Sequence, residues 1–427
     1  MRRTARTTML TALLAGSALA LTACGGGGGF DDDGDPPAAT DGADGDTDAD
    51  SGTPLTVLIG SSGDAETDAV TAAVAAWAEE SGTEASVTVA ADLNQELAQG
   101  FAAGSPPDVF YGSTDQLAGW AANGSLYPYG EQLSNADDFY PSLVDNFTVE
   151  DQFYCAPKDF STLALVINTD AWEAAGLTDA DIPTDWDSLA AAAGTLTTGD
   201  QVGLSFGPEY QRVGVFMKQA GGGLLNEDGT EVIADSPENL EALAFVQTML
   251  TDGVAAFPSQ IDSGWGGEAF GSGRAAMTIE GNWIIGAMTS TYPDINYTVV
   301  PLPAGPAGEG TLQFTNCWGI AADSENQGGA LSLVEYLTTA EQQVAFAEAF
   351  GVMPSVASAS EEFRSSFPEQ AAFVDSAEFA GGMPTQQGAS DVIADMNGQI
   401  EGLATADLEA LLASVQTNMQ AVLDSAG

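Results

Sequence analysis

The chain has 427 residues, a formal net charge of −54 at pH 7 and no histidine. The absence of histidine excludes Ser-His-Asp catalysis, Cys-His catalysis and histidine-ligated metal sites. The negative charge argues against nucleic acid as a partner and against direct binding of the folded domain to an anionic membrane surface.

The first residues have the pattern of a targeting segment. Three arginines within the first six residues precede an apolar run from Met9 to Leu21. A basic region followed by a short apolar region is typical of a signal peptide, and a membrane span needs about 20 apolar residues. The run ends in LTAC, closing at Cys24, which resembles a bacterial lipobox. We expect a signal peptide over 1–23 and a lipid on Cys24; an ordinary secretory signal with a chance cysteine is the alternative.

The segment after Cys24 is rich in glycine, aspartate and proline up to about residue 53. Phe30 is its one bulky apolar residue, so the segment cannot bury a core, and we expect a disordered stalk over 24–53. The remaining residues, 54–427, exceed the usual size of a single core, and we expect two lobes there.

The ordered part opens with alternating strand and helix patterns. Strands are predicted over 55–60, 85–90 and 108–111, and helices around Val70 and over 93–103. This order favours a mostly parallel sheet covered by helices. Ligands of such sheets bind at the carboxyl ends of the strands.

Later segments follow the same patterns. Strands are predicted within 161–172, over 275–279 and from residue 297, and helices over 184–196, 239–249, 328–349 and 389–423. The turn Glu280-Gly281-Asn282 separates one of these strands from Trp283, which opens a predicted helix. An aromatic side chain at such a turn either fills a core or faces a ligand.

Four segments together carry a family resemblance. They are 105–129, 153–177, 269–288 and 350–356. In this order the chain resembles the extracellular solute-binding proteins of ABC importers, in the sugar-binding family that includes maltose-binding protein. The segment AFGSGRAAMTIEGNWIIGAM matches that family's apolar strand followed by Gly-x-Trp. The resemblance covers essentially all of 54–427.

The resemblance implies an α/β, two-lobe periplasmic-binding-protein fold of the type II kind. Each lobe is expected to be a mostly parallel sheet flanked by helices, and hinge strands join the lobes. Lobe 1 is expected at about 54–160 and 295–336, and lobe 2 at about 165–290 and 340–427. The solute would bind in the cleft between them, and hinge motion would close the lobes.

The resemblance also implies binding residues. The family's corresponding tryptophan stacks on the apolar face of a sugar, so Trp283 is expected to do so, with core packing as the alternative. Asp115 would accept hydrogen bonds from sugar hydroxyls, unless it is only a helix-cap or first-turn acid. For Asp159 the alternative is an ion pair with Lys158, and for Trp265 it is packing. The further candidates are Ser62, Asp159, Ser161, Tyr210, Gln211, Trp265 and Asn282.

Two cysteines remain beyond Cys24. An exported chain with two internal cysteines usually pairs them, so we expect a disulfide between Cys155 and Cys317. Two buried free thiols are the alternative. Trp318 adjoins Cys317 and is expected to pack against the structure around it.

The leading functional hypothesis is a lipid-anchored subunit of an ABC importer, which captures a mono- or oligosaccharide and delivers it to the permease. It would act as a monomer at the extracytoplasmic face of the cell membrane, without cofactor, metal or catalytic residue. A cationic solute such as a polyamine is the alternative ligand. A glycoside hydrolase has little support, because pairs of carboxylates carry no information among 62 acids. The acidity itself reflects either a high-salt habitat or a bias of the lineage.

Overall fold

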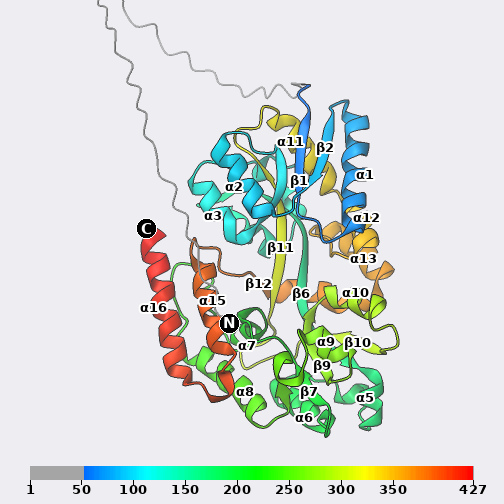
Figure 1. Ribbon diagram of the computed structural model, residues 1–427, viewed down its shortest axis with the longest axis vertical. Helices are drawn as coiled ribbons and strands as arrows, with labels where there is room; N and C mark the ends of the chain where they lie inside the picture. The colour runs from blue at the N-terminus through cyan, green and yellow to red at the C-terminus, as the bar shows by residue number, and fades with distance from the viewer. Residues whose placement is uncertain (1–51, 427) are drawn as a thin grey trace, which may run out of the picture. The chain divides into compact units, whose positions relative to one another are not determined.

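The computed structural model describes residues 52–426. The predicted signal peptide, Cys24 and residues 24–51 of the predicted stalk lie outside the described residues. The described chain is an α/β fold in which helices pack around a mixed sheet (Figure 1). Between residues 52 and 426, no helix has the length and hydropathy needed to cross a bilayer.

Residues 55–113 alternate between strand and helix, as predicted. The elements are β1 (Leu55–Ile59), α1 (Asp64–Ser81), β2 (Ala85–Val89), α2 (Leu93–Ala103) and β3 (Val109–Ser113). β1 pairs in parallel with both β2 and β3. α1 buries Val70, Val74 and Trp77, which recur at helical spacing. α2 begins where the Asp92 carboxylate accepts a hydrogen bond from the backbone N–H of Gln95.

Two long strands run through the middle of the sheet (Figure 1). Four short elements lead up to them: α3 (Thr114–Ala122), α4 (Pro141–Asn146), β4 (Thr148–Val149) and β5 (Gln152–Phe153). The long strands are β6 (Ala156–Asn168), buried along its whole length, and β11 (Thr311–Ile320). β11 pairs antiparallel with β3 on one side and with β6 on the other. The two strands therefore join the N-terminal β-α-β-α-β segment to the rest of the sheet.

The sheet continues beyond β6. Its further strands are β7 (Val202–Ser205), β8 (Ala255–Ala256), β9 (Ala275–Gly281) and β10 (Tyr297–Val300). The short strand β12 (Ala380–Gly381) instead pairs in parallel with β11. β9 and β10 pair antiparallel with β6, whereas β7 pairs in parallel with β8 and β9. Within residues 52–426 the main path runs β2-β1-β3-β11-β6-β9-β7-β8. The expected parallel pairing thus holds toward both ends, and the crossing strands make the middle antiparallel.

The helices between residues 169 and 290 flank β7 to β10. They are α5 (Thr169–Ala174), α6 (Trp186–Leu196), α7 (Tyr210–Gln219), α8 (Pro237–Thr251), α9 (Gly266–Gly271) and α10 (Trp283–Ser290). α6 starts with a capping box in which Asp185 and Ser188 satisfy each other's backbone N–H groups. α10 begins at Trp283 directly after β9 and the turn residue Asn282, as the sequence predicted.

The chain from residue 327 onward is mostly helical. Its helices are α11 (Gln327–Leu337), α12 (Ala340–Phe350), α13 (Ser360–Ser366), α14 (Ala371–Asp375), α15 (Ala389–Ile400) and α16 (Leu408–Ala426). The predicted helical stretch 328–349 is divided because Thr339 caps the start of α12. The stretch 389–423 is likewise two helices, which pack side by side (Figure 1).

Two large hydrophobic clusters lie in the described chain. The first includes β1, β3 and α1 with the end of β11. The second includes the latter half of β6, α6 to α8, and the C-terminal helices α15 and α16. α12 contributes Val344 and Phe346 to the first cluster, because it packs against α1. Leu302, which follows β10, and Leu312, near the start of β11, belong to the second cluster. The lobe bounds given above, with 340–427 in lobe 2 and 295–336 in lobe 1, remain a prediction.

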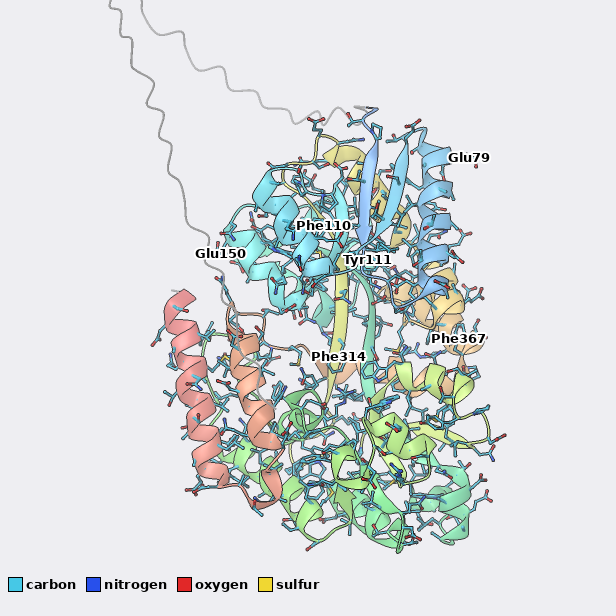
Figure 2. The ribbon with its side chains drawn as sticks, in the orientation of Figure 1. Glu79, Phe110, Tyr111, Glu150, Phe314 and Phe367 are labelled. Carbon is cyan, nitrogen blue, oxygen red and sulfur yellow. A yellow bond between two sulfur atoms is a disulfide. The ribbon has the colours of Figure 1, made fainter. Side chains whose placement is uncertain are left out.

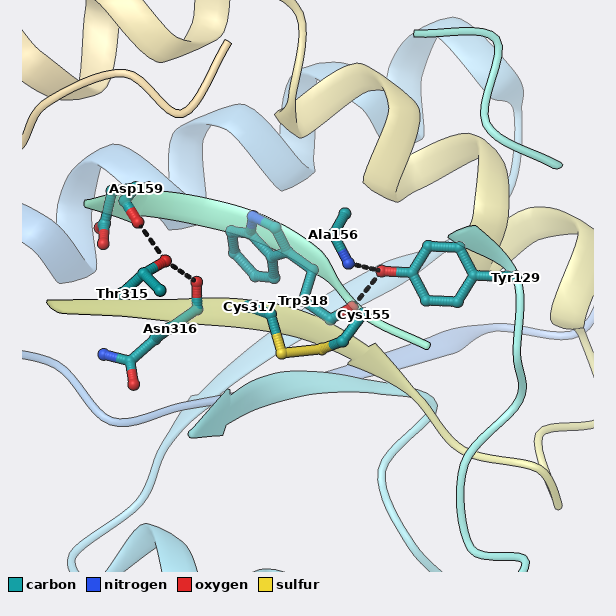
Figure 3. The surroundings of a disulfide bond; sticks show 8 residues. All are labelled: Tyr129, Cys155, Ala156, Asp159, Thr315, Asn316, Cys317 and Trp318. Atoms are coloured by element: carbon teal, nitrogen blue, oxygen red, sulfur yellow. Dashed lines mark hydrogen bonds between the residues drawn. A yellow bond between two sulfur atoms is a disulfide. The ribbon is translucent and has the colours of Figure 1, made fainter. Parts of the chain in front are cut away.

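A disulfide joins Cys155 to Cys317, with their Cα atoms 5.5 Å apart (Figure 3). Cys317 lies on β11, and Cys155 immediately precedes β6, so the bond connects the two crossing strands. Next to it, the Tyr129 hydroxyl donates to the Trp318 carbonyl and accepts a 2.8 Å hydrogen bond from the backbone N–H of Ala156. Trp318 is buried beside this bond, as expected.

Candidate functional site

A cleft of about 470 Å³ opens beside the middle of β6 and β11. We call it the central cleft. It is lined by Ser62, Thr114, Asn146, Asp159, Phe160, Ser161, Asn282, Trp283, Gln313, Phe314, Thr315, Asn316, Phe350, Gly351, Val352 and Met383. These residues come from the loop after β1, the starts of α3 and α10, the end of α4, both crossing strands, the end of α12 with the residues after it, and the segment after β12. The strand ends that the sequence indicated as ligand-facing therefore contribute to one cavity.

The aromatic wall of the central cleft is formed around Trp283. Its side chain is 40% exposed, although most large apolar side chains in the described chain are buried. The rings of Phe314 and Trp283 meet edge to face at a centroid distance of 5.7 Å. Figure 2 labels Phe314 on β11. Phe160 and Phe350 line the same cavity. Such a wall offers aromatic surface to a ligand that has an apolar face.

A buried ion pair between Arg212 and Glu280 contacts the Trp283 side chain. Its indole N–H donates a 3.0 Å hydrogen bond to Glu280 Oε2, and Arg212 Nη2 lies 2.7 Å from the same oxygen. The Arg212 guanidinium carbon lies 5.3 Å from the centroid of the Trp283 ring, a cation–π contact. Burial raises the pKa of the Glu280 carboxyl, and the Arg212 charge offsets only part of that rise.

The polar wall contains a second buried charge cluster. The Lys158 ammonium contacts the Asp159 carboxylate and lies 3.3 Å from Glu66 Oε1, and it is 4.5 Å from the centroid of the Tyr111 ring. The Tyr111 hydroxyl donates to Glu66 Oε1 at 3.0 Å. Asp159 therefore forms the ion pair with Lys158 that the sequence suggested as an alternative, and it also lines the central cleft. Glu66 was not predicted, because it stands in an ordinary helical first turn.

The pKa values of this cluster follow from burial and charge. Burial raises the pKa of the Asp159 carboxyl, and Lys158 offsets only part of that rise. Burial also acts to raise the pKa of Glu66, but Lys158 and the hydrogen bonds from Ser62 and Tyr111 outweigh it, so that pKa is lowered. Burial acts to lower the pKa of Lys158, but the two carboxylates outweigh it and raise that pKa. Lys158 is therefore held in its charged form.

Three other predicted residues line the central cleft and also tie its walls together. The backbone N–H and the hydroxyl of Ser62 each donate a 2.7 Å hydrogen bond to Glu66 Oε2. The Ser161 hydroxyl accepts from the backbone N–H of Asn282 at 3.3 Å. The Asn282 side-chain amide donates to the Gly351 carbonyl at 2.8 Å. These bonds fix the loop after β1 and the β9–α10 turn at the cleft.

Residues of β11 supply polar groups that the sequence reasoning missed. Thr315 donates a 2.6 Å hydrogen bond to the Asp159 carbonyl, and Gln313 donates a 2.7 Å bond to the Ser142 carbonyl. The exposed side-chain amide of Asn316 has no hydrogen-bond partner among residues 52–426 (Figure 3). Gln313 and Thr315 stand on either side of Phe314 in β11. This alternation of polar and apolar residues is the sequence signal that could have identified them as site residues.

Four predicted residues lie apart from the cleft lining. Asp115 is exposed on the first turn of α3, where the Gln116 amide donates to it at 3.3 Å. Tyr210 is buried in the second hydrophobic cluster, because it opens α7 with its ring turned inward. Gln211 is half-buried beside it. Trp265 is half-buried, with its ring folded over Gly267.

Comparisons with known proteins agree with this architecture. Residues 72–379 match the family described as bacterial extracellular solute-binding protein. A binding protein of Brucella abortus is 24% identical over 278 residues, which are 61% of this chain and 66% of that protein. The chain therefore spans slightly less than two thirds of the length of the curated relatives it matches.

Solved structures show the same fold. The GacH receptor of Streptomyces glaucescens has a TM-score of 0.74 at 22% identity, over 87% of this chain and 98% of that one. The sugar-binding protein MalE of Xanthomonas citri has a TM-score of 0.78 at 20% identity, over 87% and 98%. The first is described as a receptor and the second as a sugar-binding protein. With the family match over most of its length, this chain belongs to the bacterial extracellular solute-binding proteins.

Proposed function

We propose that this protein captures a neutral carbohydrate in the central cleft and delivers it to the permease of an ABC importer. The observation that carries the proposal is the exposed Trp283 ring in a cavity whose other walls are mostly uncharged. A sugar has apolar C–H faces that stack on an aromatic ring and hydroxyls that exchange hydrogen bonds around its rim. The central cleft offers both kinds of partner.

The charges around the cavity favour a neutral ligand. Asp159 is the one charged side chain among the cleft-lining residues of the described chain, and it is paired with Lys158. Arg212, behind the aromatic wall, is paired with Glu280. A polyamine would need unpaired carboxylates and an anionic solute would need unpaired cations, because a buried unpaired charge is costly.

The size and the relatives support the same ligand class. The cavity of about 470 Å³ lies within the usual range of about 300–1,000 Å³ for small-molecule sites. The GacH receptor has been solved in complex with acarbose, and an Arthrobacter globiformis relative at 20% identity binds cyclic α-maltosyl-1,6-maltose. At these identities the relatives support a carbohydrate without identifying the sugar.

We propose further that the mature protein is a monomer, anchored at the extracytoplasmic face of the cell membrane by a lipid on Cys24. The support is the LTAC motif after a basic and apolar leader. Lipid labelling of the wild-type protein and of Cys24→Ala in the native host tests the anchor. Labelling should disappear in the variant, and an unlabelled wild-type protein would refute the anchor.

A ligand panel tests the proposed function. The mature protein is heated with glucose, maltose, maltotetraose or spermidine, and its Tm is measured. A ligand at a hundred times its Kd stabilises the folded state by about 2.7 kcal/mol. We expect a neutral sugar to raise the Tm and spermidine to leave it unchanged. A rise with spermidine alone would refute the sugar, and release of a product from a glycoside would refute a binding protein.

A further inference from the structure

Trp283 is exposed, yet its orientation is strongly constrained. The indole N–H is bonded to Glu280, and Arg212 packs against the ring. The ring also lies over the backbone of the preceding turn: a Cβ added at Gly281 would stand 2.2 Å from it. An aromatic side chain with no such contacts would sample several rotamers and lose that freedom when a ligand stacked on it. Here the ring is fixed before any ligand arrives.

Glu280 is the centre of this arrangement. One oxygen, Oε2, accepts hydrogen bonds from both the Arg212 guanidinium and the Trp283 indole N–H. The residue is only 1% exposed, and it does not line the central cleft. A carboxylate buried to this degree requires a paired charge, which Arg212 supplies. The position of the Trp283 ring therefore follows the position of the ion pair.

We propose that Glu280, together with Arg212, is a positioning residue that holds Trp283 in its cleft-facing orientation. Glu280 does not contact the ligand; it acts on binding through the indole ring. The link to sugar affinity rests on the function proposed above, whereas the effect on the ring itself does not. Glu280 thus has a different role from the catalytic carboxylate of a glycoside hydrolase, which must reach the substrate.

The chain offers a way to move the Glu280 carboxylate without changing any charge. A Cβ at Gly266 would stand 2.6 Å from Glu280 Oε1 and 2.7 Å from Thr278 Oγ1, so Gly266→Ala must shift them. Gly286 on α10 has no atom within 4 Å of an added Cβ. Gly286→Ala is therefore the matched control for the same chemical change.

The first experiment observes the ring directly in the mature protein without ligand. Indole ¹⁵N–¹H spectra are recorded, and the Trp283 signal is assigned by its loss in Trp283→Phe. We expect Glu280→Ala to shift this signal and to speed its exchange with water, because the carboxylate acceptor is lost. Glu280→Gln keeps an acceptor and should give a smaller shift. Gly266→Ala should shift the signal, and Gly286→Ala should not.

An unchanged Trp283 signal in folded Glu280→Ala would overturn the proposal. If Glu280→Ala does not fold, Gly266→Ala and Arg212→Lys test the proposal in its place. An unchanged Trp283 signal in both variants would also overturn the proposal. A shift of the Trp283 signal in Gly286→Ala as large as in Gly266→Ala would also overturn it, because the effect would then not pass through Glu280.

The second experiment measures the Kd for maltose and maltotetraose by calorimetry. We expect Glu280→Ala to weaken binding about tenfold, because a ring that is no longer held must be ordered when the sugar stacks on it, and Glu280→Gln to recover part of the affinity. Equal affinity in Glu280→Ala and wild type would overturn the link to binding. If wild type binds no sugar of the panel, the proposed function fails, and the indole signal still decides the role of Glu280.

Discussion

At the residue scale, the main feature of the site is the exposed Trp283 side chain together with Glu280 and Arg212, which contact it. Trp283 and Val89 are the large apolar side chains left exposed in the described chain, and only Trp283 lines the central cleft. Asp159 faces the same cavity, with Lys158 holding one of its oxygens. The site thus combines an exposed aromatic ring with a carboxylate whose lysine partner is shared with Glu66.

Replacing Trp283 by alanine separates binding from folding. We expect sugar affinity to fall at least about tenfold, because stacking area and aromatic geometry are both lost. The unfolding free energy without ligand should change little, since the ring is half-exposed and no core cavity is created. Denaturant unfolding and calorimetry measure the two effects, with Trp283→Phe as the conservative control. A large loss of stability without ligand would place the ring in the core instead.

At the element scale, β6 and β11 connect the two hydrophobic clusters. The register between them shifts at Asn316 and Cys317, where β11 leaves the first cluster and approaches the cleft. Two links reinforce the strands near this point: the Cys155–Cys317 disulfide and the contact of Lys158 on β6 with Glu66 on α1. Each link can be removed separately.

The disulfide closes a loop of 162 residues. A cross-link over a long loop stabilises mainly by restricting the unfolded chain, typically by about 2–4 kcal/mol. We expect Cys155→Ala combined with Cys317→Ala to lower the unfolding free energy by that amount. Dithiothreitol should destabilise the wild-type protein and leave the double variant unaffected. Two alkylatable thiols in the native wild-type protein would show that the bond does not form.

The Glu66–Lys158 link is expected to depend on pH. Folding lowers the pKa of Glu66 below its ordinary value of 4.5, so its contribution is present above that pH and is lost as the pH falls through the folded-state pKa. The difference in unfolding free energy between wild type and Glu66→Gln should therefore shrink on acidification. Asp159, whose pKa is raised mainly by burial, responds in the opposite sense, and the Glu66 charge contributes to that rise. A difference that stays constant across pH 4.5 would contradict this assignment.

At the scale of the whole molecule, the two clusters lie toward opposite ends of β6 and β11. The cleft-lining residues come from both sides: Ser62 and Thr114 follow strands of the first cluster, and Trp283 follows β9 of the second part of the sheet. A ligand that touches both sides favours the closed arrangement by its differential affinity.

We expect the protein to become more compact when a sugar of the panel binds. Small-angle scattering should show a smaller radius of gyration with saturating ligand, because hinge motion brings the two sides together. Trp283→Ala at the same sugar concentration serves as the control and should remain like the ligand-free protein. An unchanged radius at saturation would contradict closure.

The sequence by itself predicted most elements of the fold, because periodicity and capping are local properties. Val70, Val74 and Trp77 are one example, and the start of α10 at Trp283 is another. It did not predict that α12 packs on α1, since an apolar helix face does not specify which neighbour covers it.

The composition of the central cleft was decided by tertiary structure. The predicted Ser62, Asp159, Ser161, Asn282 and Trp283 meet there, but Tyr210 turns into the core because of how α7 packs. Gln313 and Asn316 became cleft residues only when β11 paired with β3 and β6. The supports of Trp283 likewise come from segments far apart in the chain, Arg212 on α7 and Glu280 on β9. The sequence by itself determined the residue types and the local periodicity of helices and strands. The contacts between distant segments were decided by tertiary structure, because they depend on packing in three dimensions.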